Sequence, residues 1–321
     1  MKPSILIVGA GAVGQVYARF LMRAGAQVTF FVKEKYRAEL EGGLPLYHFR
    51  LRGYRRELLE GYRLISDPEQ VAAESWDQVW LTMASDALRS GLTRQVLANT
   101  GNATVVSIQL DLEDSDYLHG LIGRDRLVQG IVNFLSYQSP LPGYHSPPAG
   151  IAWHLFPLPG DFAGPWERLS EVVNLMDLGE FPIRAVENFE RAAAPKAAMN
   201  IPLVAALESA GWSLESCLKG PALELGLKAA REALAVVGKL YEAEDEVRPM
   251  KLMAKPFLVR NAVRALDKVT PYDLEAYLKY HFTKVGVQTR IMLHTYRQKA
   301  EQLGLPSAAL TDLLRALGEP V

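Results

Sequence analysis

The sequence has little that would place the protein outside the cell, in a membrane or on a nucleic acid. A single cysteine, Cys217, excludes an internal disulfide and suits a reducing compartment. No apolar run reaches the roughly 18 residues that a membrane-spanning helix needs. Lysine plus arginine (35) nearly balances aspartate plus glutamate (36), and no basic run is interleaved with aromatic residues, which argues against nucleic-acid binding. We therefore expect a soluble, cytoplasmic protein that acts on a small molecule.

Several reactive-site patterns are missing as well. The six histidines show no H-x-x-x-H or similar ligand spacing, so we expect no metal site. The sequence has no G-x-S-x-G segment of the kind that carries a serine nucleophile. The acidic segment LDLEDSDY (110–117) contains Asp111, Glu113, Asp114 and Asp116 but lacks the glycine and terminal glutamate of a calcium loop. We interpret it as the solvated start of a helix.

What the chain does have is an alternation of aliphatic runs and helical segments. Runs typical of buried parallel strands lie at 4–8, 27–32, 76–83, 103–110 and 126–138. Helical spacing separates some of them, as at 15–26 and 85–100. This alternation predicts a Rossmann-type α/β fold with a doubly wound sheet. At one edge of the sheet we expect a mixed strand at 150–160, packed by Trp153, Phe156 and Trp166.

The texture of the sequence changes after about residue 185. From there nearly every segment has helical periodicity, and Ser307 is a natural N-cap for the last helix. We therefore expect two domains: 1–185 binds a dinucleotide, and 186–321 is all-helical and serves substrate binding and dimerisation. A homodimer is consistent with the amphipathic helices of the second domain.

The first strand is followed by a G-x-G-x-x-G motif, and the motif opens a helix. Such glycines permit a tight turn and a close backbone approach, and the helix N-terminus attracts a pyrophosphate. The context favours a dinucleotide site over a merely structural turn. The residues predicted for it are Gly9, Ala10, Gly11, Ala12, Val13 and Gly14.

The end of the second strand indicates which dinucleotide is bound. NAD sites usually place an acidic residue there, whereas this chain has Lys33, followed by Lys35 and Arg37. A cation suits the 2′-phosphate of NADP, although the adjacent Glu34 leaves a solvated loop of mixed charge as the alternative. At the ends of the next two strands, we include Met83, Ala84 and Gln109 among the cofactor-binding residues.

The segment AAAPKAAMNIPLVAAL (192–207) contains only two polar side chains, Lys196 and Asn200. Their spacing of four places both on one helix face. Because the rest is small or aliphatic, we expect that face to be partly buried. A buried ammonium is costly, so we expect this lysine to have either a partner or a function. A snorkelling surface lysine is the alternative.

With these segments together, the chain resembles the ketopantoate reductase (2-dehydropantoate 2-reductase) family. The resemblance includes ILIVGAGAVGQVYARFLMRAGAQVTFFVK at the front, KAAMN, and AEQLGLPSAALTDLL near the C-terminus. It implies a Rossmann domain, a helical domain like that of 6-phosphogluconate dehydrogenase, and an active site in the cleft between them. It also implies reduction of a 2-oxo acid by NADPH, with Lys196 as the proton donor and Asn200 as a substrate ligand.

The chain departs from the family pattern at the substrate-binding positions. The family usually has a lysine where this chain has Ala84, an asparagine at Leu110 and a glutamate near Gly286. A site that hydrogen-bonds a polar substrate tolerates such losses badly. Lys284 and Gln288, an i, i+4 pair on one expected helix, are candidates to replace these contacts, and ordinary surface residues are the alternative. A non-catalytic NADP(H)-binding sensor or scaffold is therefore the second functional hypothesis.

Overall fold

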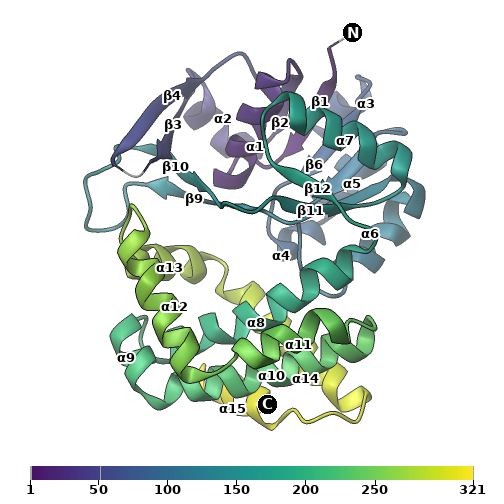
Figure 1. Ribbon diagram of the computed structural model, residues 1–321. Coiled ribbons are helices and arrows are strands. Elements are labelled where there is room, and N and C mark those ends of the chain that lie inside the picture. Colours follow the sequence, from purple (N-terminus) through teal and green to yellow (C-terminus); the bar gives the residue numbers. More distant parts are fainter. Residues whose placement is uncertain (1, 51, 321) are drawn as a thin grey trace. The chain divides into compact units, whose positions relative to one another are not determined.

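The computed structural model describes residues 2–50 and 52–320, and the chain divides into two compact units, Met1–Phe189 and Glu190–Val321. All strands of the described residues belong to the first unit, drawn from purple to teal in Figure 1, whereas the second unit is helical. The division falls at 189/190, against the expected 185/186. The fold class, a mixed α/β unit followed by a helical unit, is confirmed.

The first unit is built on an eight-stranded sheet with the strand order β12-β11-β8-β7-β6-β1-β2-β5. Its strands are β1 (Ser4–Val8), β2 (Gln27–Phe31), β5 (Arg63–Ile65), β6 (Gln78–Leu81), β7 (Thr104–Ser107), β8 (Leu127–Gly130), β11 (Gly160–Ala163) and β12 (Ile183–Ala185). Neighbouring strands are parallel except that β11 runs antiparallel to β8. From β1 the chain adds β2 and β5 on one side and β6, β7 and β8 on the other, so the strand order changes direction between β1 and β6. In doubly wound sheets a ligand binds at this switch point, outside the carboxyl ends of the strands.

Helices cover both faces of this sheet. They are α1 (Ala12–Arg23), η1 (Glu34–Tyr36), α2 (Arg37–Leu40), α3 (Pro68–Ala72), α4 (Ser85–Leu88), α5 (Gly91–Ala98), α6 (Asp114–Ile122), η2 (Arg124–Arg126) and α7 (Trp166–Leu178). Strand β1 shows why both faces need cover: Ile5 and Ile7 belong to one core, and Leu6 and Val8 belong to another. Because successive strand residues point to opposite faces, an unbroken aliphatic run is buried on both sides.

A second sheet, which the sequence did not predict, has the order β4-β3-β10-β9. Its strands are β3 (Leu44–Phe49), β4 (Tyr54–Leu59), β9 (Phe134–Ser139) and β10 (Gly150–Leu155). The expected strand 126–138 is therefore wrong, since it divides into β8 in the large sheet and β9 in the small one. Asn133 marks the division: its buried side-chain amide donates to the Pro182 carbonyl (2.8 Å). The strand expected at 150–160 begins as predicted but also joins the small sheet.

Two further expectations need correction. The segment 85–100, expected as one helix, is broken between α4 and α5, where the Ser90 hydroxyl caps α5 by accepting from the Thr93 backbone N–H. The expected aromatic cluster does not form, because Trp153 is buried (1% exposed) while Phe156 (43%) and Trp166 (70%) are exposed. The Trp153 ring packs edge-on against Phe20 of α1.

The helical unit is organised around α10. Its helices are α8 (Phe189–Ser209), α9 (Leu214–Lys219), α10 (Pro221–Leu240), α11 (Glu244–Met253), α12 (Pro256–Val269), α13 (Leu274–Lys284), α14 (Gly286–Gln302) and α15 (Ala308–Ala316). Helix α10 packs against α9, α11, α14 and α15. Ser307 occupies the N-cap position of α15, but its side chain makes no capping bond. The Glu232 carboxylate of α10 does so instead, accepting from the N–H groups of Ala309 (3.0 Å) and Leu310 (2.9 Å).

Across the part of the chain that the structure describes, no helix combines the length and apolar character needed to cross a membrane.

Candidate functional site

The glycine motif lies at the switch point of the large sheet, between the end of β1 and the start of α1. Gly9 adopts φ +103°, a conformation that side chains disfavour, and its N–H donates to the Phe31 carbonyl (3.0 Å). Gly14 is required for a different reason, because a Cβ there would lie 2.2 Å from the Gly9 carbonyl oxygen. These two glycines allow α1 to begin in direct contact with the loop.

Gly11 differs from both, because nothing in the protein requires a glycine there. A Cβ at this position would meet no atom within 4 Å, and its backbone is extended at φ −73° and ψ −174°. Gly11 is exposed at the N-cap of α1, and no side chain caps the helix. The first-turn N–H groups and the positive end of the helix dipole therefore face a space that suits a pyrophosphate. The loop fits a dinucleotide, with Ala10, Ala12 and Val13 lying between the three glycines.

Thr82, which our sequence interpretation did not single out, holds the loop in place. It is the first residue after β6, and its hydroxyl lies 2.8 Å from the Gly9 carbonyl and 3.1 Å from the Val8 carbonyl, to which it donates. The missing side chain of Gly14 leaves room for this hydroxyl, which would lie 2.7 Å from a Cβ. The signal in the sequence was a polar, β-branched residue at the end of an otherwise buried strand.

Gln109 is buried (5% exposed) and makes its hydrogen bonds within the protein. Its amide nitrogen donates to the carbonyls of Leu81 (3.0 Å) and Met83 (2.6 Å), and its amide oxygen accepts from the Ser107 hydroxyl (2.6 Å). The side chain that we predicted to contact the cofactor therefore braces the end of β7 against the end of β6. Met83 and Ala84 are partly exposed at this edge.

Lys33 follows the end of β2 and is exposed. Lys35 and Arg37 are engaged by neighbours: the Lys35 ammonium lies 4.8 Å from the centre of the Tyr36 ring, and Arg37 pairs with Glu41 at 3.5 Å. Among residues 2–50 and 52–320, Lys33 has no ion pair or ring contact. It is thus the cation of this loop that is available to a phosphate.

The acidic segment at 110–117 is not the solvated helix start that we expected. Asp114 is 2% exposed and Asp111 7% exposed, although Asp116 is at the surface. The Asp114 carboxylate accepts from the Ser85 hydroxyl (2.6 Å) and from the Arg89 guanidinium. Burial raises the pKa of Asp111, and the nearby negative charge of Asp114 adds to this. Tertiary contacts to Ser85 and Arg89 account for the burial of Asp114, and the sequence pattern does not show them.

The K-x-x-x-N segment lies on α8, in the helical unit. Lys196 and Asn200 are both exposed, whereas Ala193, Ala197 and Ala198 are buried, so the predicted shared face exists. Within the helical unit this face is exposed, so the expected partial burial stays a prediction. Two prolines lie inside the helix, and Pro195 directly precedes the lysine.

Ion pairs anchor α8 near both ends. The Arg191 guanidinium pairs with Glu246 of α11 (3.0 Å). Near the C-terminal end, Arg290 of α14 pairs with Glu208 (2.7 Å) and with Glu319 (2.9 Å). These three side chains are only 21–27% exposed, which strengthens the pairing relative to a surface ion pair. The helix that carries Lys196 is therefore fixed within its unit.

Lys284 and Gln288 do not lie on one helix, contrary to our expectation. Lys284 ends α13 and Gln288 belongs to α14, with a break at Val285. The Lys284 ammonium is held by Tyr280, donating to its hydroxyl (2.6 Å) and lying 3.9 Å from the ring centre. Gly286 is buried, and a Cβ there would lie 3.2 Å from an Arg290 nitrogen.

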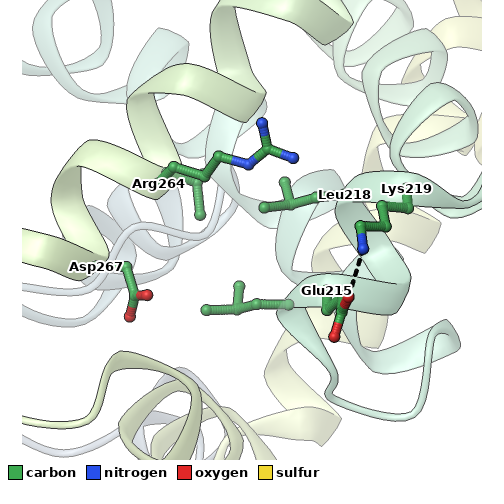
Figure 2. Close-up of a pocket in the computed structure, with 7 residues that line it drawn as sticks. Glu215, Leu218, Lys219, Arg264 and Asp267 are labelled. Carbon is green, nitrogen blue, oxygen red and sulfur yellow. Dashed lines mark hydrogen bonds and ion pairs between the residues drawn. The ribbon is translucent and has the colours of Figure 1, made fainter.

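The helical unit also has a cavity of about 250 Å³ between α9 and α12 (Figure 2). Lys219 and Glu215 form an ion pair at one side, and Arg264 and Asp267 of α12 lie across from them. None of the site residues predicted from the sequence lines this cavity. Over the described parts of the chain, no three His, Cys, Asp or Glu side chains are grouped so that they could hold a metal ion.

Comparison with known proteins supports the resemblance noted from the sequence. Residues 5–145 match the family model described as ketopantoate reductase PanE/ApbA. No curated protein sequence matches the chain.

Solved structures match over nearly the whole length. The 2-dehydropantoate 2-reductase of Geobacter metallireducens GS-15 is 18% identical with a TM-score of 0.67, and the match covers 98% of this chain and 99% of that one. A PanE/ApbA family ketopantoate reductase of Ralstonia eutropha JMP134 is 17% identical with a TM-score of 0.68, covering 98% and 97%. A D-mandelate dehydrogenase in complex with NADH is 10% identical with a TM-score of 0.67, covering 99% and 98%. At these identities the likeness establishes a shared fold.

Proposed function

We propose that the protein is an NADPH-dependent oxidoreductase of the ketopantoate reductase family that reduces a 2-oxo acid, because residues 5–145 match the family model described as ketopantoate reductase PanE/ApbA. The observation that carries the proposal is the glycine loop. An uncapped helix N-terminus faces a space left open at Gly11, and the lysine after β2 is free to bind a phosphate.

The residues of the first unit would hold the cofactor. Backbone N–H groups at the start of α1 would bind the pyrophosphate, and Lys33 would bind the 2′-phosphate as a point charge. The segment after β6, braced by Thr82 and Gln109 beside the switch point, would support the nicotinamide half. When bound, the reduced nicotinamide supplies a hydride to the carbonyl carbon of the substrate.

Lys196 is proposed as the proton donor. A carbonyl that accepts a hydride develops alkoxide character at its oxygen, and a nearby ammonium stabilises that charge and supplies the proton. Asn200 lies one turn further along the same face of α8 and would orient the substrate oxygen. The names of the structural relatives support the substrate class. The protein from Geobacter metallireducens is a 2-dehydropantoate 2-reductase, and a D-mandelate dehydrogenase was determined in a ternary structure with NADH and anilino(oxo)acetate.

A panel of 2-oxo acids, including 2-dehydropantoate and benzoylformate, tests the proposal through NADPH oxidation at 340 nm. Lys196→Ala should lower kcat by two to four orders of magnitude, roughly the contribution of a general acid, with little change in NADPH affinity. The matched control, Lys228→Ala, removes an exposed lysine from α10 and should leave turnover unchanged. If Lys196→Ala keeps wild-type turnover, the lysine has no part in the chemistry.

A dinucleotide-binding sensor is the second candidate, favoured by the small or apolar residues Ala84 and Leu110 where the resemblance implies polar substrate ligands. Tight NADPH binding without turnover of any carbonyl compound in the panel would support the sensor and refute the reductase.

A further inference from the structure

The segment Thr82–Ser85, at the carboxyl end of β6, is tethered at three of its four residues. The Thr82 hydroxyl donates to the Gly9 carbonyl (2.8 Å), and the Met83 carbonyl accepts from the Gln109 amide (2.6 Å). The third tether is the Ser85 hydroxyl, which donates to the Asp114 carboxylate (2.6 Å). The segment is thus held by the residues that follow β1 and β7 and by the first turn of α6.

Asp114 is the centre of the third tether. Its carboxylate is 2% exposed and receives both the Ser85 hydroxyl and the Arg89 guanidinium. The same guanidinium donates to the Ser85 carbonyl (3.2 Å) and lies 5.0 Å from the centre of the Tyr117 ring. Arg89 therefore holds Ser85 in two ways. It donates to the Ser85 carbonyl, and it donates to the Asp114 carboxylate that binds the Ser85 hydroxyl.

Asp111 lies beside this arrangement and is incompletely bonded. It is 7% exposed, and one carboxyl oxygen accepts from the Glu113 N–H (3.0 Å). The other oxygen is buried and has no hydrogen-bond partner among the described residues. The charged groups that act on it are Asp114, Arg89 and Glu113. A buried carboxylate oxygen without a donor is costly, whereas the protonated acid avoids placing a second charge next to Asp114.

We propose that Asp111 and Asp114 are positioning residues: Asp114 binds the Ser85 hydroxyl and the Arg89 guanidinium, Asp111 lies beside it, and together they hold Thr82–Ser85 in the conformation that accepts the nicotinamide half of the dinucleotide. The inference rests on the proposed function, because it takes a nicotinamide dinucleotide as the ligand. Ionisation of Asp111 places a second carboxylate beside Asp114 and competes for Arg89. The Ser85 tether then weakens, and the segment loses its fixed position.

The pH dependence of dinucleotide binding tests this arrangement. Dissociation constants for NADPH and NADH are measured by nicotinamide fluorescence from pH 5 to 9 for wild type and each variant. At each pH the dissociation constant of wild type is divided by that of Asp111→Asn, so that any effect of pH on the dinucleotide itself cancels and only the effect of Asp111 remains. Wild-type affinity should fall as pH rises through the raised pKa of Asp111, because the acidic form is the one that holds the segment. Asp111→Asn should abolish this fall and retain the affinity of the low-pH form.

Asp114→Asn should weaken binding roughly tenfold at every pH, the effect of losing a charge-assisted hydrogen bond. The matched control is Asp116→Asn, also on α6, whose side chain is 85% exposed; it should behave as wild type. A pH profile of Asp111→Asn that coincides with wild type overturns the proposal, as does unchanged affinity in Asp114→Asn.

Hydrogen exchange separates this inference from the proposed function. Amide protection of a peptide covering residues 82–90, measured without any dinucleotide, should fall in Asp114→Asn and should lose its pH-dependent loosening in Asp111→Asn. If wild type binds neither dinucleotide but the exchange pattern holds, the proposed function fails and the positioning pair stands. If binding is intact and exchange is the same in all variants, only the positioning pair fails.

Discussion

Replacing Gly14 by alanine should damage both stability and dinucleotide binding. The new methyl group would lie 2.2 Å from the Gly9 carbonyl oxygen and 2.7 Å from Thr82 Oγ1, well inside the roughly 3.5 Å of ordinary contact. Neither atom can rotate away, because one is backbone and the other hydrogen-bonds to it. Overpacking of this kind costs about 1–3 kcal/mol, and alanine regains about 0.5–1 kcal/mol through its helix propensity. The net loss therefore lies in the range of about 0–2.5 kcal/mol, and the immobility of both atoms places it in the upper half of that range.

The comparison with Gly11→Ala separates packing from ligand contact. A methyl group at residue 11 meets no protein atom within 4 Å, and its backbone conformation suits alanine. Stability should fall by only about 0.5 kcal/mol, because alanine is a poorer N-cap than glycine. NADPH affinity should nevertheless fall at least roughly tenfold, since the methyl group occupies the space where the pyrophosphate would approach.

Urea denaturation and fluorescence titration with NADPH measure the two effects. Gly91→Ala is the control: it lies at the first position of α5, has open space around its Cβ, and should leave affinity unchanged and stability unchanged or slightly raised. Unchanged NADPH affinity in Gly11→Ala would falsify the assignment of the loop to a dinucleotide. An undiminished free energy of unfolding in Gly14→Ala would show that the contact between α1 and the loop is not as tight as described.

Three other perturbations have definite expected outcomes. Lys33→Glu should weaken NADPH binding at least roughly tenfold and leave NADH binding nearly unchanged, and equal losses for both would remove Lys33 from 2′-phosphate recognition. Burial, together with the charge of Arg19, lowers the pKa of His48 to about 4, so the stability contributed by the neutral ring should be present above about pH 6.5 and be lost as pH falls through 4. Because His48 is partly exposed, we reduce the expected loss to about 1–2 kcal/mol, which urea titrations should show in wild type and not in His48→Gln. Arg290→Ala should destabilise the helical unit by about 1–3 kcal/mol, because it leaves Glu208 without its guanidinium partner and Glu319 with only His294 at 3.7 Å, whereas Arg315→Ala, at a surface pair with Asp312, should cost less than about 0.5 kcal/mol.

Local pattern was sufficient for the glycine motif and its surroundings. The aliphatic run at 4–8, the glycines and the helix that follows are specified by residues close together in the chain, and the structure places them as predicted. The helical unit was predictable for the same reason, although Ser307 does not cap α15 and the expected helix through Lys284 is broken. A carboxylate from α10 and a turn at Val285 decide those two details.

Contacts between distant residues decided what the sequence pattern left open or predicted wrongly. The run 126–138 is rich in strand-forming residues on both sides of Asn133, so periodicity cannot show that Asn133 bonds to Pro182 where the chain passes from β8 to β9 in a second sheet. Composition likewise makes 110–117 look solvated, whereas Ser85 and Arg89, 25 or more residues away, bury Asp114. Hydrophobic periodicity specifies which face of an element is covered. Which partner satisfies a buried polar group depends on chain segments that meet only when the protein folds, and here that decided the positions of Asp114 and Gln109.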